Sequence, residues 1–408
     1  MKRLNRVLPS NTLALLQQAV AIATAKELPL YLVGGPVRDL LLQQPITDLD
    51  LVVQGDAWLV AEAFQAVVGG TLTQHARFRT AVVEVTSDDG TLAIDFVTAR
   101  SESYPAPAAL PVVTPSHIHD DLQRRDFTIN TLALRLTAPH ALLDPFGGRN
   151  DIAAGWIRVL HDASFRDDPT RILRAVRFAA RFSFALESHT RMLILAALND
   201  DLIMQTTAPR ILNELWLLLA EPQPEAALHL LHELGALPQL VLPWTDPLPE
   251  QFAAARTANW GGVSLRELYV GLLIWSMTAA QRAAFTNRYN LPAAERKLAH
   301  ELSRVPLDAL RQPQIDAPTL EQLLQPFSIA TLRVLQLVAQ PPVKQHIAHY
   351  VDEIQPLQPL LSGDDLRVRG ILPGSHYRAL FAELRRAQLN GEIVTREAAL
   401  HWLATYNP

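Results

Sequence analysis

The chain contains no cysteine among its 408 residues. Disulfide bonds, cysteine-ligated zinc and thiol catalysis are therefore excluded, and the composition fits a protein of the reducing cytoplasm. No apolar run approaches the roughly 18 residues that a membrane-spanning helix requires, so we expect no membrane partner. The amino-terminal stretch is basic and then apolar, but Gln17, Gln18 and Lys26 interrupt it and no small-residue cleavage site follows. This pattern indicates an amphipathic helix and not a signal peptide.

An excess of positive charge is also missing. The formal net charge is −5, which by itself argues mildly against a nucleic-acid partner. Local charge matters more, because a basic stripe can follow a phosphate backbone even on an acidic protein. Such a stripe lies between residues 166 and 191 and consists of Arg166, Arg171, Arg174, Arg177, Arg181 and Arg191.

The order of predicted elements separates a small α/β head from a long helical remainder. Helical spacing alternates with short apolar strands over the first hundred residues, and helical periodicity prevails beyond residue 120. In the head, Asp56 is a predicted N-cap of the helix over 56–68, and the strands over 80–86 and 91–99 flank an Asp-Asp-Gly turn, which predicts a hairpin. Proline-rich stretches near 105–115, 222–224 and 238–249 mark loops or joints. We therefore predict an α+β fold, in which a mixed-sheet head over 1–150 precedes an all-helical neck over 151–225 and an all-helical body and tail over 226–408.

Two aspartates open one of the predicted strands, in the segment TDLDLVV. Residues i and i+2 of a strand share a face, so Asp48 and Asp50 project together while Leu49 and Leu51 point into the core. Neighbouring carboxylates repel each other unless a cation lies between them. Oxygen ligands suit Mg²⁺, which also binds substrate phosphates, and a two-metal site stabilises an in-line displacement. The pattern predicts that Asp48 and Asp50 are catalytic and bind Mg²⁺.

A glycine pair and an arginine precede these aspartates. Gly34 and Gly35 lack a Cβ, so their backbone can approach a triphosphate closely, and the helix that follows offers free N–H groups. Arg38, one turn into that helix, can clamp phosphate oxygens. A lone Gly-Gly or Asp-x-Asp is common on protein surfaces, but the order strand, Gly-Gly, helix with arginine, strand with two aspartates is more specific. It is not a Walker loop, because no Gly-x-x-x-x-Gly-Lys-Ser/Thr occurs.

The string YLVGGPVRDLLLQQPITDLDLVV (31–53) resembles the first motif of the class II bacterial tRNA nucleotidyltransferase and poly(A) polymerase family, which belongs to the DNA polymerase β-like nucleotidyltransferases. DDLQRRDFTINTLAL (120–134) resembles its second motif. By this resemblance Arg125 contacts the nucleotide, and Asp126 is a plausible helix N-cap. LLDPFGGRNDI (142–152) resembles the third motif, which we interpret as a hinge between head and body.

The segment RDDPTRILRAVRFAARF (166–182) resembles the fourth motif, with Asp167 in place of the family's glutamate. Asp168 accepts and Arg171 donates hydrogen bonds, three residues apart on one helix face, which is a geometry that can match a base edge. An exposed structural ion pair is the alternative. The resemblance implies that this pair selects CTP and ATP, and that Arg174 and Arg177 reach the triphosphate.

Three further features modify the comparison. Pro209 replaces the first glutamate of the fifth motif, while Arg210 and Glu214 remain and can form an i,i+4 pair. The long loop over 101–118 has nearly the length typical of the family, which disfavours an enzyme that adds only CC. Asp95, in the strand AIDFV, is a candidate third carboxylate that deprotonates the attacking hydroxyl.

The resemblance thus implies a cytoplasmic enzyme that adds C or A from CTP and ATP to the 3′ end of tRNA, with Mg²⁺ and without an obligate protein partner. A poly(A) polymerase acting on RNA ends shares the same motifs, although the tail lacks the basic extension usual in those enzymes. A non-catalytic RNA-binding protein is disfavoured, because both aspartate motifs are intact. The sequence leaves open whether CCA, only A or only CC is added.

Overall fold

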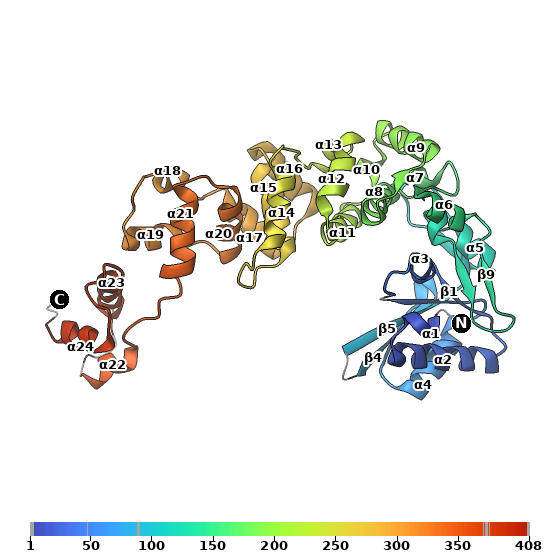
Figure 1. The fold of residues 1–408 in the computed structure, drawn as a ribbon, viewed down its shortest axis with the longest axis horizontal. Helices are drawn as coiled ribbons and strands as arrows, with labels where there is room; N and C mark the ends of the chain where they lie inside the picture. The colour runs from blue at the N-terminus through green and yellow to red at the C-terminus, as the bar shows by residue number, and fades with distance from the viewer. Residues whose placement is uncertain are drawn as a thin grey trace. The chain divides into compact units, whose positions relative to one another are not determined.

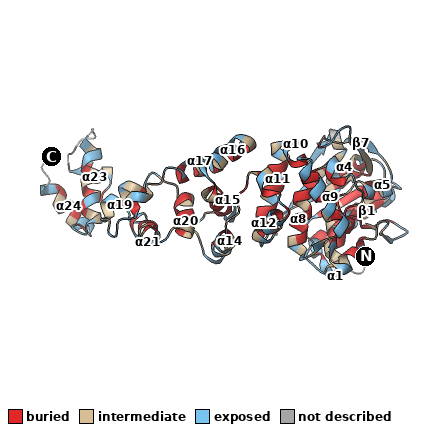
Figure 2. Cartoon of the chain, turned by 90° about the horizontal axis from the view of Figure 1, so that it is seen from above, coloured by how far each residue is buried: buried red, intermediate tan, exposed pale blue. Residues whose placement is uncertain are grey.

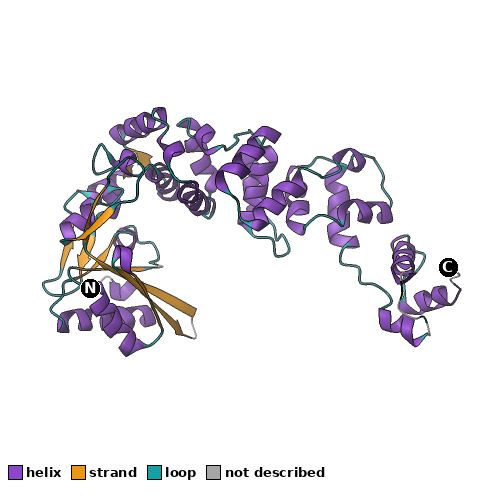
Figure 3. Ribbon diagram, turned by 180° about the vertical axis from the view of Figure 1, so that it is seen from behind, coloured by secondary structure: helices purple, strands orange, loops and turns teal. Residues whose placement is uncertain are grey.

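The computed structural model describes residues 4–46, 48–87, 90–369, 371, 374 and 376–405. They form two compact units, Met1–Leu240 and Val241–Pro408. All the strands described lie in the first unit, and the second is built from helices (Figure 3). The predicted α+β class, a mixed sheet followed by helices, is confirmed. The boundaries proposed at residues 150 and 225 both fall inside the first unit and stay predictions.

A seven-stranded mixed sheet forms the centre of the first unit (Figure 1). Among the described strands, the order is β3-β4-β5-β2-β1-β8-β9, and β2 and β5 make its one parallel pairing. The strands of this sheet are β1 (Leu30–Val33), β2 (Leu49–Val53), β3 (Thr71–His75), β4 (Thr80–Ser87), β5 (Gly90–Thr98), β8 (Ala133–Arg135) and β9 (Ala141–Leu143).

The helices of the first unit are interleaved with two small strand pairs, β6 (Arg100–Ser103) with β7 (Val112–Pro115) and β10 (Trp156–Ile157) with β11 (Ala185–Leu186). The described helices, including the 3₁₀ turns η1 and η2, are α1 (Leu4–Val7), α2 (Ser10–Ala25), α3 (Gly35–Leu41), α4 (Ala57–Val68), η1 (Ala76–Phe78), α5 (Ile118–Gln123), η2 (Thr128–Asn130), α6 (Gly148–Ala154), α7 (Ser164–Asp167), α8 (Thr170–Phe182), α9 (Ser188–Asn199), α10 (Leu202–Gln205), α11 (Ala208–Leu219), α12 (Pro224–Glu233) and α13 (Leu237–Leu240).

Strand β1 is buried on both faces, and its alternation shows how the sheet divides the core. Leu30 and Leu32 belong to the main apolar cluster, which also contains residues of α2 and α4. Tyr31 and Val33 point the other way, into a smaller cluster with Leu122 of α5. Helices α2 and α4 therefore cover one face of the sheet, as Figure 1 shows, and the opposite face carries the polar residues described below.

Several local predictions are confirmed by the structure. Asp56 caps α4, since its side chain accepts a hydrogen bond of 3.0 Å from the backbone N–H of Trp58. Strands β4 and β5 form the predicted antiparallel hairpin. Gly148 opens α6 after the turn of the third motif, and a Cβ there would lie 2.2 Å from the carbonyl oxygen of Thr128. The close packing of α6 on η2 thus requires glycine at this position.

Two local predictions are wrong. The segment 101–118, expected to be a loop, contains the β6–β7 hairpin, in which Ser103 pairs with Val112. Asp126 does not cap an α-helix, because only the 3₁₀ turn η2 follows it. Its buried carboxylate instead forms an ion pair with Arg174, which lies 48 residues away in the sequence. Tertiary pairing has overridden the local preference for a cap.

The second unit has apolar cores of its own, and buried residues alternate with exposed ones along its helices (Figure 2). In the described part of the chain, no helix is both long and apolar enough to cross a membrane. The helices described in this unit, including the π-helical turn η3, are α14 (Leu248–Thr257), α15 (Leu265–Ser276), α16 (Ala279–Tyr289), α17 (Ala293–Leu302), α18 (Leu307–Leu310), α19 (Ala317–Leu324), α20 (Ile329–Val338), α21 (Val343–His349), η3 (Tyr350–Ile354), α22 (Gly363–Val368), α23 (His376–Leu389) and α24 (Arg396–Thr405).

Candidate active site

Carboxylates from two neighbouring strands gather on the face of the sheet opposite α2 and α4. Leu49 and Leu51 of β2 are at most 1% exposed and lie in the main core, as predicted. Asp50 therefore projects from the other face, and Asp48, two residues earlier, is exposed just before the strand begins. Asp95 of β5 is the register partner of Asp50 across the parallel pairing. The strand geometry brings the predicted third carboxylate to the same face.

The carboxyl groups of this cluster repel one another when they are ionised. Burial, which is the largest cause, and the negative charges of Asp95 and Asp48 raise the pKa of Asp50 to about 6, against the opposing effect of Arg125 and Arg38. Burial and the charge of Asp48 likewise raise the pKa of Asp95. A divalent cation between these oxygens would relieve the repulsion, so the donor set fits such an ion.

The described residues contain no group of three or more His, Asp or Glu side chains placed to hold a metal on their own. Mg²⁺ characteristically binds through one or two carboxylates and completes its shell with water and substrate phosphates. Asp48 and Asp50 would hold the ion in that mode. Any further oxygens would come from the nucleotide.

Gly34 has a structural role besides the predicted close approach to a triphosphate, which stays a prediction. Its φ is +69°, and a Cβ there would lie 2.5 Å from Nη1 of Arg125. The missing side chain therefore makes room for a guanidinium group. Arg125 is in turn held by Asp121, whose Oδ2 accepts a hydrogen bond of 3.1 Å. Gly35 is the first residue of α3, and a Cβ there would have Nη2 of Arg38 as its nearest neighbour, at 3.6 Å.

Arg38 is 4% exposed and is fixed on all sides. Its Nη1 donates to Oδ1 of Asn130 at 2.6 Å, and it forms an ion pair with Asp39 at 2.8 Å. Its guanidinium carbon lies 5.3 Å from the ring centroid of Phe178 and 4.6 Å from that of Phe182. These contacts fix the orientation of the Arg38 guanidinium group on α3 before any ligand binds.

A polar pocket of about 410 Å³ opens over these residues, a volume in the range of small-molecule sites. It brings together most of the predicted site, including Asp50, the arginines of motifs one and two, and the fourth-motif pair. The residues that line it are Gly35, Arg38, Asp50, Glu102, Tyr104, Arg124, Arg125, Asp126, Asn130, Asp168, Arg171, Arg174 and Phe178.

The fourth-motif pair is held in place by long-range contacts. Asp168 forms an ion pair of 2.7 Å with Arg210 of α11, so Arg210 does not make the predicted pair with Glu214. Arg171 is 5% exposed, and it donates to Oγ of Ser164 at 2.7 Å and to the carbonyl oxygen of Arg124 at 2.9 Å. Both side chains line the pocket, where an acceptor and a donor can face a base.

Arg174 and Arg177 serve a second ion-pair network. Arg174 binds Asp126 at 2.7 Å and Glu214 at 3.4 Å, while a part of its side chain lines the pocket. Burial lowers its pKa, but the carboxylates of Asp126 and Glu214 outweigh that effect and raise it. Arg177 is 7% exposed and binds Glu221 at 3.2 Å. Contact of Arg174 and Arg177 with a triphosphate stays a prediction.

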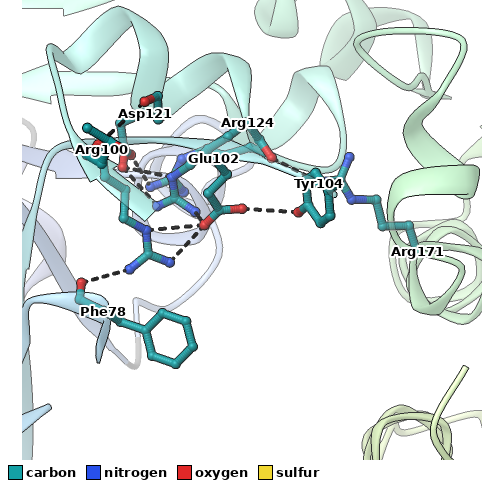
Figure 4. Close-up of polar contacts among 10 residues, drawn as sticks. Phe78, Arg100, Glu102, Tyr104, Asp121, Arg124 and Arg171 are labelled. Atoms are coloured by element: carbon teal, nitrogen blue, oxygen red, sulfur yellow. Dashed lines mark hydrogen bonds and ion pairs between the residues drawn. The ribbon is translucent and has the colours of Figure 1, made fainter. Parts of the chain in front are cut away.

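The sequence analysis missed Glu102 and Tyr104, which line the same pocket (Figure 4). Glu102 accepts hydrogen bonds from Arg100 at 2.9 Å, Arg124 at 3.0 Å and the hydroxyl of Tyr104 at 3.1 Å. Figure 4 shows the Tyr104 ring beside Arg171. Burial, followed by the charge of Glu102, raises the pKa of Tyr104 to about 12. Nothing in the local sequence places these residues at the pocket, because Arg124 and Arg171, which bring them to it, come from other elements.

This head and its pocket define a nucleotidyltransferase. The family described as "Poly A polymerase head domain" matches residues 30–158, and "Probable RNA and SrmB- binding site of polymerase A" matches residues 183–248. The chain belongs to the family of tRNA nucleotidyltransferases and poly(A) polymerases. Members of this family generally use a divalent metal ion.

Curated relatives and a solved structure support this assignment. The chain is 34% identical to an A-adding tRNA nucleotidyltransferase of Geobacter sulfurreducens over 97% of its own length and 47% of that protein. It is 32% identical to the A-adding enzyme of Halalkalibacterium halodurans (98% and 93% covered) and 38% identical to the CC-adding enzyme of Deinococcus radiodurans (78% and 83%). The Thermotoga maritima CCA-adding enzyme in complex with tRNA superposes with a TM-score of 0.76 at 29% identity, over 99% of this chain and 97% of that one.

The chain thus spans about half the length of the Geobacter relative and nearly all of the Halalkalibacterium one.

Proposed function

We propose that this chain transfers nucleotides from ATP or CTP to the 3′ end of tRNA and releases pyrophosphate. The observation that carries the proposal is that one pocket is lined both by Asp50 of β2 and by the acceptor Asp168, which lies between α7 and α8, with the donor Arg171 of α8. Asp50 serves the transfer chemistry, and Asp168 with Arg171 recognises the base. Their common pocket allows base choice without a nucleic-acid template.

Each residue has a distinct task in this reaction. The 3′-hydroxyl attacks the α-phosphate, and the bond from that phosphorus to the bridging oxygen of pyrophosphate breaks. Mg²⁺ held by Asp48 and Asp50 would stabilise the charge on the attacking and leaving oxygens. Asp95 lies beside Asp50 and accepts the proton of the hydroxyl. Arg38 and Arg125, which both line the pocket, bind the phosphates of the nucleotide.

The terminal A is the addition that we favour. Two of the relatives compared above are A-adding enzymes that align with nearly this whole chain, whereas the CC-adding relative aligns with 78% of it. The full β6–β7 hairpin loop is also present, which the sequence analysis associates with activity beyond CC addition. A tRNA substrate would place the protein in the cytoplasm.

The test uses tRNA transcripts that end before CCA, after C and after CC, each incubated with Mg²⁺ and with ATP, CTP or both. We expect a single A to be added to the transcript ending in CC, as resolved on a denaturing gel. Addition of C to the shorter transcripts would assign CCA or CC synthesis instead.

An unfolded RNA oligonucleotide serves as the control for the main alternative. A poly(A) polymerase would extend it with many A residues, whereas an enzyme that recognises tRNA leaves it unextended. Failure to extend any RNA with any nucleotide would refute the proposed function.

A further inference from the structure

Arg210 of α11 makes two hydrogen bonds that join the pocket residue Asp168 to the loop between β6 and β7. Its Nη2 donates to Oδ1 of Asp168 at 2.7 Å, and its Nη1 donates to the carbonyl oxygen of Ala108 at 2.8 Å. Asp168 precedes the helix α8, and Ala108 lies in the loop between β6 and β7. One guanidinium group therefore binds two segments that are 60 residues apart in the sequence.

The contacts of Asp168 fix one of its oxygens and leave the other for a ligand. Oδ1 accepts from Arg210, from the backbone N–H of Thr170 at 3.0 Å and from the Thr170 hydroxyl at 2.6 Å. Within the described residues these donors all bind Oδ1, so Oδ2 remains for a group in the pocket. A carboxylate oxygen in this position can accept a hydrogen bond from the exocyclic amino group of a base.

Ala108 is docked at both of its backbone polar groups. Its N–H donates to the carbonyl oxygen of Arg166 in α7 at 3.1 Å, and its carbonyl accepts from Arg210. It is 9% exposed, although residues 105–107 and 110 are exposed, and its φ of +58° is unusual for alanine. The surrounding contacts hold this strained conformation, which marks Ala108 as the anchor of the loop.

We propose that Arg210 is a positioning residue that couples the docking of the loop at Ala108 to the orientation of Asp168, and thereby sets which bases the pocket accepts. This inference rests on the proposed function, because it assigns base selection to Asp168. An arginine is required, since its planar fork serves two acceptors in fixed directions. A lysine retains the charge near Asp168 but cannot hold both segments in the same geometry.

The experiment compares wild type with Arg210→Gln and Arg210→Lys, using a tRNA ending in CC. Single-nucleotide addition is measured with ATP, GTP, CTP and UTP, and kcat and KM are determined for each. Loss of a charge-assisted hydrogen bond predicts that Arg210→Gln narrows the preference for ATP over GTP by about 10-fold or more, mainly through KM. Arg210→Lys should restore part of the preference.

A matched control separates positioning from stability. Arg158 is also a bridging arginine of the first unit, which binds Asp151 at 3.0 Å and Glu187 at 3.6 Å away from the pocket. Arg158→Gln should lower the melting temperature but leave the preference for ATP over GTP unchanged. Equilibrium binding of ATP and GTP to each variant, measured without tRNA, reports selection independently of catalysis.

The coupling is tested by a double-mutant cycle with the loop. Replacing residues 105–111 by Asn-Gly retains Tyr104 and the β6–β7 hairpin, since three-residue hairpin loops are common, but removes the Ala108 carbonyl. In that background Arg210→Gln should change the base preference several-fold less than in wild type. Equal effects in both backgrounds, or an unchanged base preference in Arg210→Gln, would overturn the inference. Absence of any addition by wild type would instead refute the proposed function.

Discussion

Asp50 and Asp95 lie side by side on one face of the sheet, as direct register partners in the parallel pairing of β2 and β5. Their α-carbons are separated by the spacing of neighbouring strands, about 4.8 Å. Both carboxyl groups have a raised pKa, and burial is the largest cause in each case. The backbone pairing therefore sets two carboxylates side by side at a cost in electrostatic repulsion that a divalent cation would offset.

Asp50→Asn should reduce nucleotide addition on the order of 10³-fold or more, because several kcal/mol of charge stabilisation in the transition state would be lost. Asp95→Asn should reduce kcat by about 10²-fold or more through loss of the proton acceptor. Asp56→Asn is the matched control, since asparagine caps a helix as well as aspartate does. Full activity of Asp50→Asn would contradict the site assignment. Rates are measured by single-turnover addition to tRNA.

Removal of divalent ions should abolish addition and leave the fold intact. The head is held by an apolar core and by internal ion pairs, and the carboxylates of the site repel each other when no cation is bound. EDTA treatment should therefore leave the circular dichroism spectrum unchanged, while Mg²⁺ should restore the rate. Persistent activity in excess chelator would rule out the proposed chemistry. Unfolding by EDTA would show that the ion has a structural role.

Gly34→Ala should impair both stability and activity, whereas Gly35→Ala should have little effect. At Gly34 the φ of +69° with a ψ of −124° is a conformation that L-residues rarely adopt, which costs on the order of 1–3 kcal/mol, and the added Cβ would lie 2.5 Å from the Arg125 guanidinium. Displacement of Arg125 should raise the KM for ATP. This effect comes in addition to the loss of stability, which lowers the melting temperature of the head. Identical behaviour of the two variants in kinetics and thermal unfolding would count against this explanation.

Stability should depend on Asp126 in acid. Arg174, Asn130 and Arg171 outweigh burial and lower the pKa of Asp126 to about 2, from 3.8. A lowered carboxyl pKa stabilises the folded state above the unfolded-state pKa, and this contribution is lost as the pH falls from about 4 to about 2. The shift corresponds to about 2 kcal/mol at neutral pH, of which about 1 kcal/mol is lost by pH 3.

Urea unfolding of wild type and Asp126→Asn therefore should show a smaller difference in free energy at pH 3 than at pH 7. Asp162→Asn is the control, because the Asp162 side chain is 80% exposed. A difference that grows on acidification would have the wrong sign for this mechanism.

The sequence predicted well those features that local periodicity determines. The alternation of Leu49, Asp50 and Leu51 assigned each side chain to the correct face of β2, and the cap at Asp56 located the start of α4. Motif order also identified Gly34 and Arg125 as parts of one site, although their direct contact was not foreseen. Strong local patterns survive in the fold because burial and hydrogen bonding reinforce them.

Contacts between distant elements lay beyond the sequence analysis. Arg210 had an i,i+4 partner in Glu214, yet it pairs with Asp168, 42 residues away. Asp126 similarly pairs with Arg174 and not with a helix terminus. In neither case does the local contact form, because Arg174 binds both Glu214, at 3.4 Å, and Asp126, at 2.7 Å. The three-dimensional packing decides such choices.

The parallel pairing of β2 with β5 has a consequence for how this chemistry can evolve. The separation of the α-carbons that carry the two carboxylates follows from hydrogen bonds of the main chain, so we expect substitutions in the apolar interior to leave it unchanged. Selection can adjust the distance only by altering the length of a side chain, one methylene at a time. Amino-acid substitutions elsewhere in the head should therefore have little effect on the relative position of Asp50 and Asp95.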